Sequence, residues 1–407
     1  MRTHRGLFPS ICSFENLLLA HRKAEKGKRF QCDTGRFRSR VERELLGLRE
    51  ELMSGNYTPG GYREKPILHP KPRIISIAPF RDRVVHHAVC NVVMPLFERK
   101  MIHDLYSNRA GKGTHAGIRR CQQFVRRFRY VLKCDVRKYF PSIDHELLKA
   151  ALRRTVRCGP TLALLDRIID ASNPQEPVWS LFPGEDLAEA GHRRVGLPIG
   201  NLTSQWFGLI HLTAFDHWVK SASDDGLGCK GYLRYVDDFL LFSDDKEELG
   251  RWRKEILQHL AGIRLRINER KCRTHRISDG VTFLGQRVWP HRRRLCAANV
   301  RAARRRLQWL AREYLRGNLG REDLQRRWTS WKGHALQADG IRLVEDVRDQ
   351  LRRTLAAREP DQPCAAGRRV EQHDQQPAVR ESQQQHADEH EQQHRVPVCP
   401  GAWDRGE

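Results

Sequence analysis

The first regular pattern along the chain is helical. Between Phe37 and Ser54, apolar residues recur at intervals of three and four, as they do on one face of an amphipathic helix. A second helical pattern covers Arg81–Phe97, and a short β-branched run at 74–77 separates the two. These patterns predict a helix, a short strand and a second helix near the start of the chain.

Apolar runs near the middle of the chain end in acidic residues. One run ends at Asp135, so it is expected to be a buried strand that terminates in a carboxylate. The runs 232–236 and 239–242 flank Asp237 and Asp238, which predicts a β-hairpin with two acids at its tip. An unpaired carboxylate beside buried apolar side chains costs free energy, so these three aspartates are expected to have a compensating partner or a function.

The remaining pattern mixes helices with short strands. Residues 171–195 contain several prolines and form a long irregular insertion. The other expected elements are, in chain order, a helix after 141–144, a long helix from the Gly/Pro turn at 196–200 to about Ser221, a helix over Glu247–Ala261, two short strands within 280–289 and a basic helical region from Asn299 to about Ala357. Strands and long helices around one small sheet indicate an α+β fold followed by a helical appendage.

The charge balance of the chain is strongly basic. Its 407 residues include 74 Lys and Arg against 49 acidic residues, a formal net charge of +25. Such an excess indicates a polyanionic partner, and nucleic acid is the leading candidate. No apolar run approaches the roughly 20 residues that span a bilayer, so no membrane partner is expected.

The cysteines and the end of the chain add two expectations. The eleven cysteines are irregularly spaced, and no pair has the Cys-x-x-Cys spacing of a zinc or redox site. They are expected to be reduced and mostly buried, as in a cytoplasmic protein. Residues 359–407 are rich in Gln and His and almost free of aliphatic side chains, so a disordered tail is predicted.

The three aspartates have the chemistry of a magnesium site. Adjacent carboxylates repel one another and are stabilised when a cation lies between them. Oxygen-rich clusters suit Mg²⁺, and two such ions about 3.5–4 Å apart can activate an attacking oxygen and stabilise a leaving one. The alternative is that Asp237 and Asp238 have no function beyond forming a hairpin turn, a position that aspartate favours.

Six ordered motifs resemble those of reverse transcriptases. Residues 234–239 (Arg-Tyr-Val-Asp-Asp-Phe) resemble the Tyr-x-Asp-Asp box of that family. The other matches are residues 133–144 for the first palm motif, 196–205 for the helix-opening motif, 265–272 for the segment after the box, 283–288 for the primer grip and 71–73 for the fingers. The resemblance covers roughly residues 15–345.

The resemblance implies a right-hand polymerase fold with fingers, palm and thumb. The fingers and N-terminal region would occupy 1–130, and the palm with its small antiparallel sheet would occupy 131–290, including the insertion at 171–195. A helical thumb would follow at 291–358, and the disordered tail at 359–407. The implied activity is RNA-directed DNA synthesis from an RNA template, a DNA or RNA primer and deoxynucleoside triphosphates.

The resemblance also implies which residues hold metal. Asp135, Asp237 and Asp238 would be catalytic and would hold two Mg²⁺ ions, with help from the backbone carbonyl of Val136. All three carboxylates are present in the sequence. This argues against the alternative of a catalytically silent RNA-binding protein that kept a polymerase fold.

Four further positions match residues that contact the incoming nucleotide in the family. Phe140 occupies the position of the ring that excludes a ribose 2′-hydroxyl and so selects deoxynucleotides. Lys71 and Arg73 would contact the triphosphate and base, and a guanidinium suits both tasks. Lys271 would lie near the pyrophosphate leaving group. The alternatives are a solvated surface lysine for Lys271 and a surface salt bridge for Arg73.

The helix-opening motif, whose Ile199, Gly200 and Gln205 would also contact the nucleotide, departs from that of most reverse transcriptases. Ile199 stands where most members carry Gln, and Gly200 is followed by Ser204 and Gln205 where most carry Ser-Pro. This form resembles the diversity-generating retroelement branch, which copies a template-repeat RNA with frequent errors opposite adenine. Replacing a polar amide with Ile removes a hydrogen-bonding constraint near the nascent pair, and discrimination built on such bonds weakens. The alternative is a neutral packing change.

The branch also implies partners and a biological role. Its enzymes act in mutagenic retrohoming, with a small basic accessory protein and a structured template-repeat RNA. The alternative within the same enzyme class is a retron or group II intron-like reverse transcriptase. An intron protein would be expected to carry further Cys or His clusters after the thumb, and a retron enzyme would lack the departures at Ile199 and Gln205.

Overall fold

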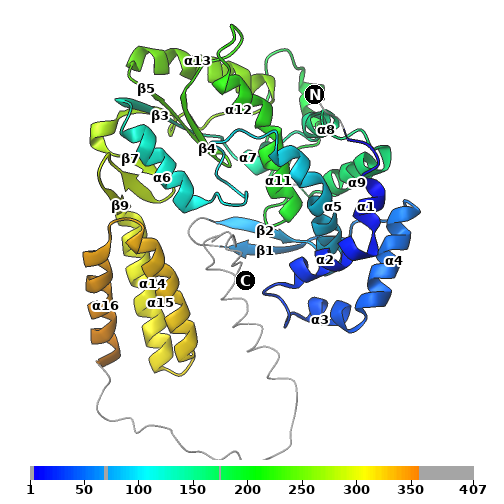
Figure 1. The fold of residues 1–407 in the computed structure, drawn as a ribbon, viewed down its shortest axis with the longest axis horizontal. Coiled ribbons are helices and arrows are strands. Elements are labelled where there is room, and N and C mark those ends of the chain that lie inside the picture. Colours follow the sequence, from blue (N-terminus) through cyan, green and yellow to red (C-terminus); the bar gives the residue numbers. More distant parts are fainter. Residues whose placement is uncertain (1–3, 68–71, 174–175, 357–407) are drawn as a thin grey trace, which may run out of the picture. The chain divides into compact units, whose positions relative to one another are not determined.

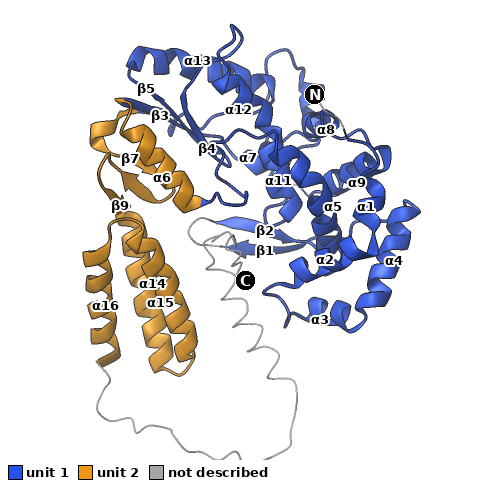
Figure 2. Cartoon of the chain, viewed as in Figure 1, with its two compact units in different colours: residues 1–113, 130–274, 401–407 blue, residues 114–129, 275–400 orange. Residues whose placement is uncertain are grey.

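The computed structural model of the chain describes residues 4–67, 72–173 and 176–356. This part divides into two compact units, which Figure 2 colours separately. Unit 1 comprises the described residues up to Gly113 together with Tyr130–Thr274, and unit 2 comprises Thr114–Arg129 and the described residues from His275 onward. Lys71 and the predicted tail lie outside the described residues.

The N-terminal part of unit 1 is helical. The long central helix α5 (Phe80–Glu98) contacts α1 (Phe8–Cys12), α2 (Phe14–Glu25) and α3 (Cys32–Ser39), and α4 (Val41–Met53) packs on the same group (Figure 1). Helix α5 confirms the pattern at 81–97. The single helix predicted over 37–54 is wrong in one respect, because Arg40 has the non-helical angles φ −131° and ψ 29° and divides it.

A four-stranded sheet has three of its strands in unit 1, and the fourth crosses the boundary of the unit after Thr274. Its strand order is β4-β5-β3-β6, where β4 is Gly231–Tyr235, β5 is Asp238–Ser243, β3 is Tyr130–Asp135 and β6 is Arg273–Arg276. Strand β5 is antiparallel to both neighbours and is almost wholly buried. Helix α13 (Lys246–Gly262) packs on β3 and β5. The hairpin and the buried strand were predicted, whereas the polar strand β6 was not.

A second, two-stranded sheet is bonded to the turn at 196–200. Strand β1 (Arg63–Ile67) pairs antiparallel with β2 (Arg73–Ile77), which confirms the strand expected at 74–77. The backbone N–H of Ser76 donates to the carbonyl of Ile199 at 2.9 Å. This bond ties the two-stranded sheet to the turn that precedes α11 (Leu202–His211).

The long helix predicted up to about Ser221 is two helices in the structure. Helix α11 ends at His211, and α12 (Thr213–Lys220) begins after Leu212, whose φ −91° and ψ 3° interrupt the helix. The bend lets Phe215 of α12 pack edge-on against Phe239 of β5, with ring centroids 5.4 Å apart. The other helices of unit 1 are α7 (Tyr139–Ser142), α8 (His145–Arg153), α9 (Gly159–Asp170) and α10 (Leu187–His192).

Unit 2 combines a small sheet with helices. Helix α6 (Thr114–Val125) contacts β7 (Val281–Phe283) and β8 (Gln286–Val288). A short 3₁₀ turn at Ile277–Asp279 precedes β7, and β9 (Arg293–Leu295) pairs antiparallel with β8. The basic region is helical as predicted, in three helices, α14 (Ala297–Leu315), α15 (Arg321–Leu336) and α16 (Ile341–Ala356). These enclose a small core of Leu307, Leu310, Ala311, Val347 and Leu351.

The described cysteines agree with the expectation of mostly buried thiols. Nine cysteines lie in the described part, all as free thiols, and seven of them are buried. Cys364 and Cys399 lie outside it. Within the described ranges, none of the helices is both long and apolar enough to cross a membrane.

Candidate active site

The β4–β5 hairpin brings the predicted acidic pair to the end of the sheet. Tyr235 pairs with Asp238, so the two turn residues are Val236 and Asp237, while Asp238 is already the first residue of β5. In the same register Asp238 lies opposite Asp135 of β3. Both acids were expected at the tip, whereas the structure places one in the turn and the other at the start of β5.

Val236 has an unusual backbone conformation in this turn. Its φ is +56°, a region that β-branched residues rarely adopt. A two-residue hairpin turn needs positive φ to follow the twist of its strands, which explains the requirement. Two hydrogen bonds hold the residue: its N–H donates to Ser107 Oγ at 3.0 Å, and its carbonyl accepts from Arg234 Nη1 at 2.7 Å.

A buried ion pair supports the hairpin below the turn. Arg234 donates to Asp216 of α12 through Nε at 2.7 Å and Nη2 at 2.5 Å, and both side chains are fully buried. Tyr232 also donates to Asp216, at 2.7 Å. Burial lowers the pKa of Arg234, but Asp216 outweighs it, so the net shift of this pKa is upward and the guanidinium stays charged. Sequence reasoning missed Asp216, because nothing in a helix pattern shows that it faces a strand.

The three aspartates lie together at the ends of β3 and β5. Asp135 is the cross-strand partner of Asp238, and the backbone N–H of Val136 donates to the carbonyl of Asp237 at 3.3 Å. The carbonyl of Asp135 accepts from the N–H of Asn268 at 2.8 Å, which attaches the segment after α13 to the same strand end. The fold therefore brings together carboxylates that are about a hundred residues apart in sequence.

Burial and mutual repulsion act on these carboxyl groups. Burial, followed by the negative charges of Asp238 and Asp135, raises the pKa of Asp237 to about 6 against the opposing effect of Arg73. Burial also raises the pKa of Asp238, which Lys133 opposes and Asp135 reinforces. Like charges on directly opposed strand positions are destabilising. The charged forms of Asp237 and Asp238 are consequently less stable here than in water, in spite of the nearby cations.

One lysine reaches the cluster directly. Lys271 Nζ lies 2.6 Å from Asp135 Oδ2, and the lysine side chain is 46% exposed. Burial lowers the pKa of Lys271, but the hydrogen bond to Asp135 and the charges of Asp238 and Asp237 outweigh it and raise this pKa. Behind this pair the buried thiols of Cys134 and Cys272 are in contact, with 3.3 Å between the two Sγ atoms. The thiol contact joins β3 to the segment that carries the lysine.

The ring of Phe140 and the helix-opening turn are also drawn together. A Cβ on Gly208 of α11 would lie 3.2 Å from the ring of Phe140, so the absence of a side chain allows helix and ring to meet. The N–H of Leu197 donates to the carbonyl of Phe140 at 2.9 Å. Gly200 has φ +116°, and a Cβ there would lie 2.8 Å from Ile75 Cγ2, so this turn lies directly against β2.

Three of the predicted nucleotide-contacting residues, Arg73, Ile199 and Gln205, lie in or next to β2 and α11. Arg73 is exposed at the start of β2 and its charge acts on Asp237, and Ile199 bonds the same strand through its carbonyl. Gln205 lies half-buried in the first turn of α11, and its backbone N–H donates to Asn201 at 3.3 Å. Lys71 lies outside the described residues. Sequence reasoning missed Lys133, which faces Asp238 from the middle of β3.

The donors present fit a hard divalent cation in their chemistry. Asp135, Asp237 and Asp238 offer only oxygen ligands, and a cation between them would relieve the repulsion that raises the pKa of Asp237. As the side chains stand, no group of three or more His, Cys, Asp or Glu in the described ranges is arranged to hold a metal ion. The ammonium group of Lys271 lies against Asp135 instead.

Comparison with known proteins places this geometry in a family. The family model for reverse transcriptases (RNA-dependent DNA polymerases) matches residues 63–288, more than half of the chain. The chain belongs to the reverse transcriptase family. This reverse transcriptase is also 27% identical over 286 residues to Protein YkfC of Escherichia coli (strain K12), a match that covers 61% of the chain and 72% of the relative.

Family membership confirms the enzyme class expected from the motifs. The matched range contains Asp135, Asp237 and Asp238, together with Phe140 and Lys271. This reverse transcriptase has the polymerase fold and is an RNA-directed DNA polymerase, a nucleotidyltransferase. Its substrates are accordingly an RNA template, a primer and deoxynucleoside triphosphates, and enzymes of this kind generally use divalent metal ions.

Proposed function

We propose that nucleotidyl transfer takes place at the carboxylate cluster of Asp135, Asp237 and Asp238. The observation that carries this assignment is the cross-strand pairing of Asp135 with Asp238 beside Asp237. Two Mg²⁺ ions bound there would supply Lewis-acid stabilisation of the attacking and leaving oxygens. The three carboxylates would hold these ions, with the carbonyl of Val136 as a further oxygen donor.

The surrounding residues would bind and orient the nucleotide. Lys271 already lies at Asp135, so a small movement would bring its ammonium group to a departing pyrophosphate, where it could neutralise charge or donate a proton. Arg73 and Lys71 would contact the triphosphate and the base from β2 and the residues before it. Phe140, held against α11 at Gly208, would close the space that a ribose 2′-hydroxyl needs.

The three parts of the right-hand layout are part of the same proposal. The fingers would lie within 1–130, the palm within 131–290 and the thumb within 291–358. The hairpin, β3 and α13 would belong to the palm, and α14, α15 and α16 to the thumb. The basic helices of the thumb would track the phosphates of a primer–template duplex, a contact that does not depend on base sequence.

We further propose that the enzyme belongs to the diversity-generating branch and acts in the cytoplasm. The support is the sequence Ile199-Gly200 followed by Gln205, together with the position of Ile199 beside β2. On this proposal the enzyme copies a template-repeat RNA with errors at template adenines, for targeted diversification of a protein. A small basic accessory protein and the structured RNA would be its partners.

Primer extension on RNA templates tests the reaction and its site. In Mg²⁺ the wild-type chain is expected to extend a DNA primer, whereas Asp237→Ala combined with Asp238→Ala is expected to abolish extension. Asp224→Ala combined with Asp225→Ala removes an adjacent acidic pair from an exposed loop and serves as the matched control. Extension that survives the loss of Asp237 and Asp238 would overturn the site assignment.

Sequencing of the products tests the branch. We expect errors to concentrate opposite template adenines, and Ile199→Gln to reduce them because an amide can again hydrogen-bond near the nascent pair. Ile199→Leu keeps an apolar side chain and should keep the wild-type error pattern. Accurate copying of adenines by the wild-type enzyme with its encoded RNA and proteins present would exclude this branch and leave the retron or intron alternative.

A further inference from the structure

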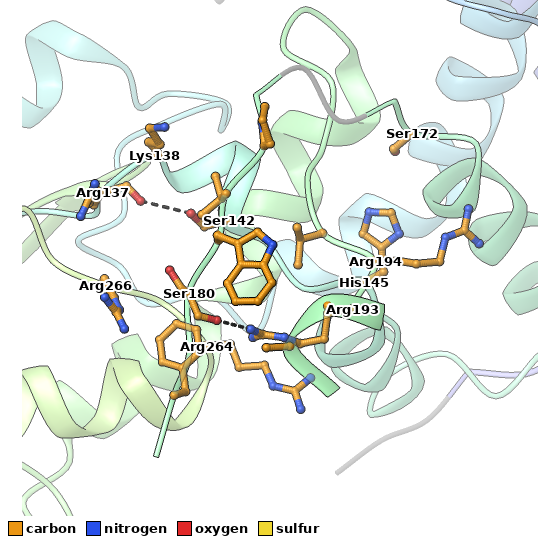
Figure 3. Close-up of a pocket in the computed structure, with 17 residues that line it drawn as sticks. Arg137, Lys138, Ser142, His145, Ser172, Ser180, Arg193, Arg194, Arg264 and Arg266 are labelled. Atoms are coloured by element: carbon orange, nitrogen blue, oxygen red, sulfur yellow. Dashed lines mark hydrogen bonds between the residues drawn. The ribbon is translucent and has the colours of Figure 1, made fainter. Parts of the chain in front are cut away.

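A basic pocket lies within unit 1, and one of its lining residues, Arg137, is two residues from Asp135 in sequence. It has a volume of about 480 Å³ and is formed by described residues of the insertion at 171–195, the segment that follows β3, and the segment that follows α13. Figure 3 shows Arg137, Lys138 and Arg266 on one side of it, and Arg193 and Arg194 on the other. The proposed polymerase mechanism uses none of these side chains.

The insertion is firmly attached to the rest of the unit. Arg264 bridges Asp144 and Glu185, at 2.8 Å to each. The guanidinium of Arg266 donates to the carbonyl of Leu181 at 2.7 Å and lies 5.3 Å from the ring centroid of Phe182. These contacts make one wall of the pocket a built part of the fold, although the insertion has little regular structure.

The charge on the pocket wall is one-sided. Six cationic side chains line it and no Asp or Glu does, the cations being Arg137, Lys138, Arg193, Arg194, Arg264 and Arg266. Four of the six are balanced from behind by carboxylates: Lys138 by Glu176, Arg193 and Arg264 by Glu185, and Arg194 by Asp170. The carboxylates of the described chain leave Arg137 and Arg266 without an ion-pair partner.

These two arginines lie next to each other. The backbone N–H of Arg137 donates to the carbonyl of Arg266 at 2.7 Å, and the residues Val136 and Ile267 beside them form an antiparallel bridge. Both arginine side chains are exposed. Two adjacent guanidinium groups with no carboxylate between them suit the phosphates of a polyanion.

An aromatic ring completes the pocket. Trp179 lines it and is 68% exposed, an unusual state for so large an apolar side chain in a segment that also buries Phe182. Indole rings bind unstacked nucleobases by stacking, which is independent of base sequence. A duplex offers no free base face to such a ring, because its bases are stacked on one another.

We propose that this pocket binds a single-stranded polynucleotide, with a base on Trp179 and the adjacent phosphates on Arg137 and Arg266. The inference goes beyond the proposed function, since it adds a binding site for an unpaired strand outside the catalytic cluster. Arg137 is two residues from Asp135 in sequence, so the strand would be held close to the reaction. RNA and DNA single strands share this chemistry, and the test separates them.

The test measures equilibrium binding and needs no catalysis. The probes are fluorescein-labelled oligouridine, oligothymidine of the same length and an RNA hairpin whose two strands are joined by a non-nucleotide linker, so that it has no unpaired base. Binding is followed by fluorescence anisotropy with the full chain in the absence of Mg²⁺. The variant combines Trp179→Ala with Arg137→Gln, both exposed side chains whose loss leaves the contacts of the insertion in place. Leu187→Ala combined with Arg43→Gln, exposed residues outside the pocket, is the matched control.

We expect the variant to bind single strands about tenfold more weakly, because stacking on one aromatic ring is worth roughly a fivefold or greater factor by itself. The control and the hairpin should be unaffected. Measured singly, Arg137→Gln should reduce the slope of log affinity against log salt by about 0.7, whereas Trp179→Ala should weaken binding at unchanged slope. A loss for oligouridine alone assigns the pocket to RNA, and an equal loss for both strands assigns it to either polymer.

Two results would overturn the proposal. In the first, the variant binds both single strands with affinities within twofold of those of the control. In the second, the variant loses equal affinity for the hairpin and for the single strands, which would indicate non-specific attraction. Neither result depends on polymerisation. Failure of the wild-type chain to extend a primer would instead count against the proposed function alone.

Discussion

Charged groups are arranged in opposite ways at two neighbouring levels of the β4–β5 hairpin, namely just below the turn, where Arg234 meets Asp216 (the base of the turn), and at the turn itself (the tip). At the base, Arg234 and Asp216 are fully buried and satisfy each other in a two-point hydrogen-bonded pair. At the tip, Asp237 and Asp238 lie beside Asp135, and burial together with like charge raises the pKa of Asp237 to about 6. The two sites are only a few residues apart along the same strands.

The difference distinguishes an ion pair that stabilises the fold from a group of carboxylates that a bound cation would stabilise. A buried pair is costly to form but very costly to break, so its partners are tied to each other. A cluster of like charges gains stability only when something positive arrives. Removing charge should therefore harm the fold at the base of the turn, whereas at the tip it should harm only the reaction.

The largest expected effect is at the tip. Asp237→Ala combined with Asp238→Ala should lower the rate of primer extension by about 10⁴-fold or more, because charge stabilisation worth several kcal/mol is lost with the metal-binding oxygens. The free energy of unfolding should stay the same or rise, since repulsion with Asp135 is removed. Urea denaturation monitors the second quantity, and a clear loss of stability would contradict the comparison.

The next effect is at the base. Asp216→Ala should lower the free energy of unfolding by about 3–5 kcal/mol, because Arg234 would remain buried without its partner. Combining it with Arg234→Leu should recover part of that loss. Asp323→Ala, which removes an exposed partner of Arg326, should change stability by about 1 kcal/mol at most. If Asp216→Ala were no worse than this control, the buried pair would have no supporting role.

Lys271 also tests the comparison, because its ion pair with Asp135 lies at the tip and should affect the reaction more than the stability. Lys271→Met should reduce extension by about 100-fold through loss of a proton donor or counter-charge. Its effect on stability should be below about 1 kcal/mol, since the side chain is half exposed and the pair is screened by solvent. Lys246→Met, an exposed lysine at the start of α13, is the control for extension rate.

The smallest effect is binding of the metal itself. Mg²⁺ at about ten times its dissociation constant should raise the free energy of unfolding by about 1.4 kcal/mol, as for any ligand that binds only the folded state. Differential scanning fluorimetry with NaCl at matched ionic strength measures it without catalysis. The chain with both Asp237→Ala and Asp238→Ala should show no such gain, and an equal gain would place the metal elsewhere.

Much of the site could be predicted because its residues follow local rules. Asp135 ends an apolar run, and Asp237 and Asp238 interrupt another, so the pattern alone showed acids next to buried strands. The spacing of Phe140 from Asp135 and the Gly/Pro turn at 196–200 are equally local. Strands β1, β6 and β9 were missed because polar residues dominate them, whereas α6 was overlooked although Ile118, Cys121 and Val125 recur in it at helical spacing.

The breaks in predicted helices have the same origin. Apolar spacing continues through Arg40 and through Leu212, so the sequence pattern shows one helix where the chain has two. At Leu212 the break turns α12 so that Phe215 and Asp216 face the sheet. Packing against partners distant in sequence determines such a bend, and a periodicity contains no information about those partners.

The enzyme class, the three acids and the strands that carry them follow from the sequence, because strand ends, turns and motif spacing are encoded by neighbouring residues. Which charges meet is known from the three-dimensional fold alone: Asp216 with Arg234, Lys271 with Asp135, and Asp135 with Asp238. The fold also decided that the insertion forms a basic pocket with Trp179 exposed. Each of these contacts joins separate elements, and pairing across a fold depends on register and burial that no local pattern contains.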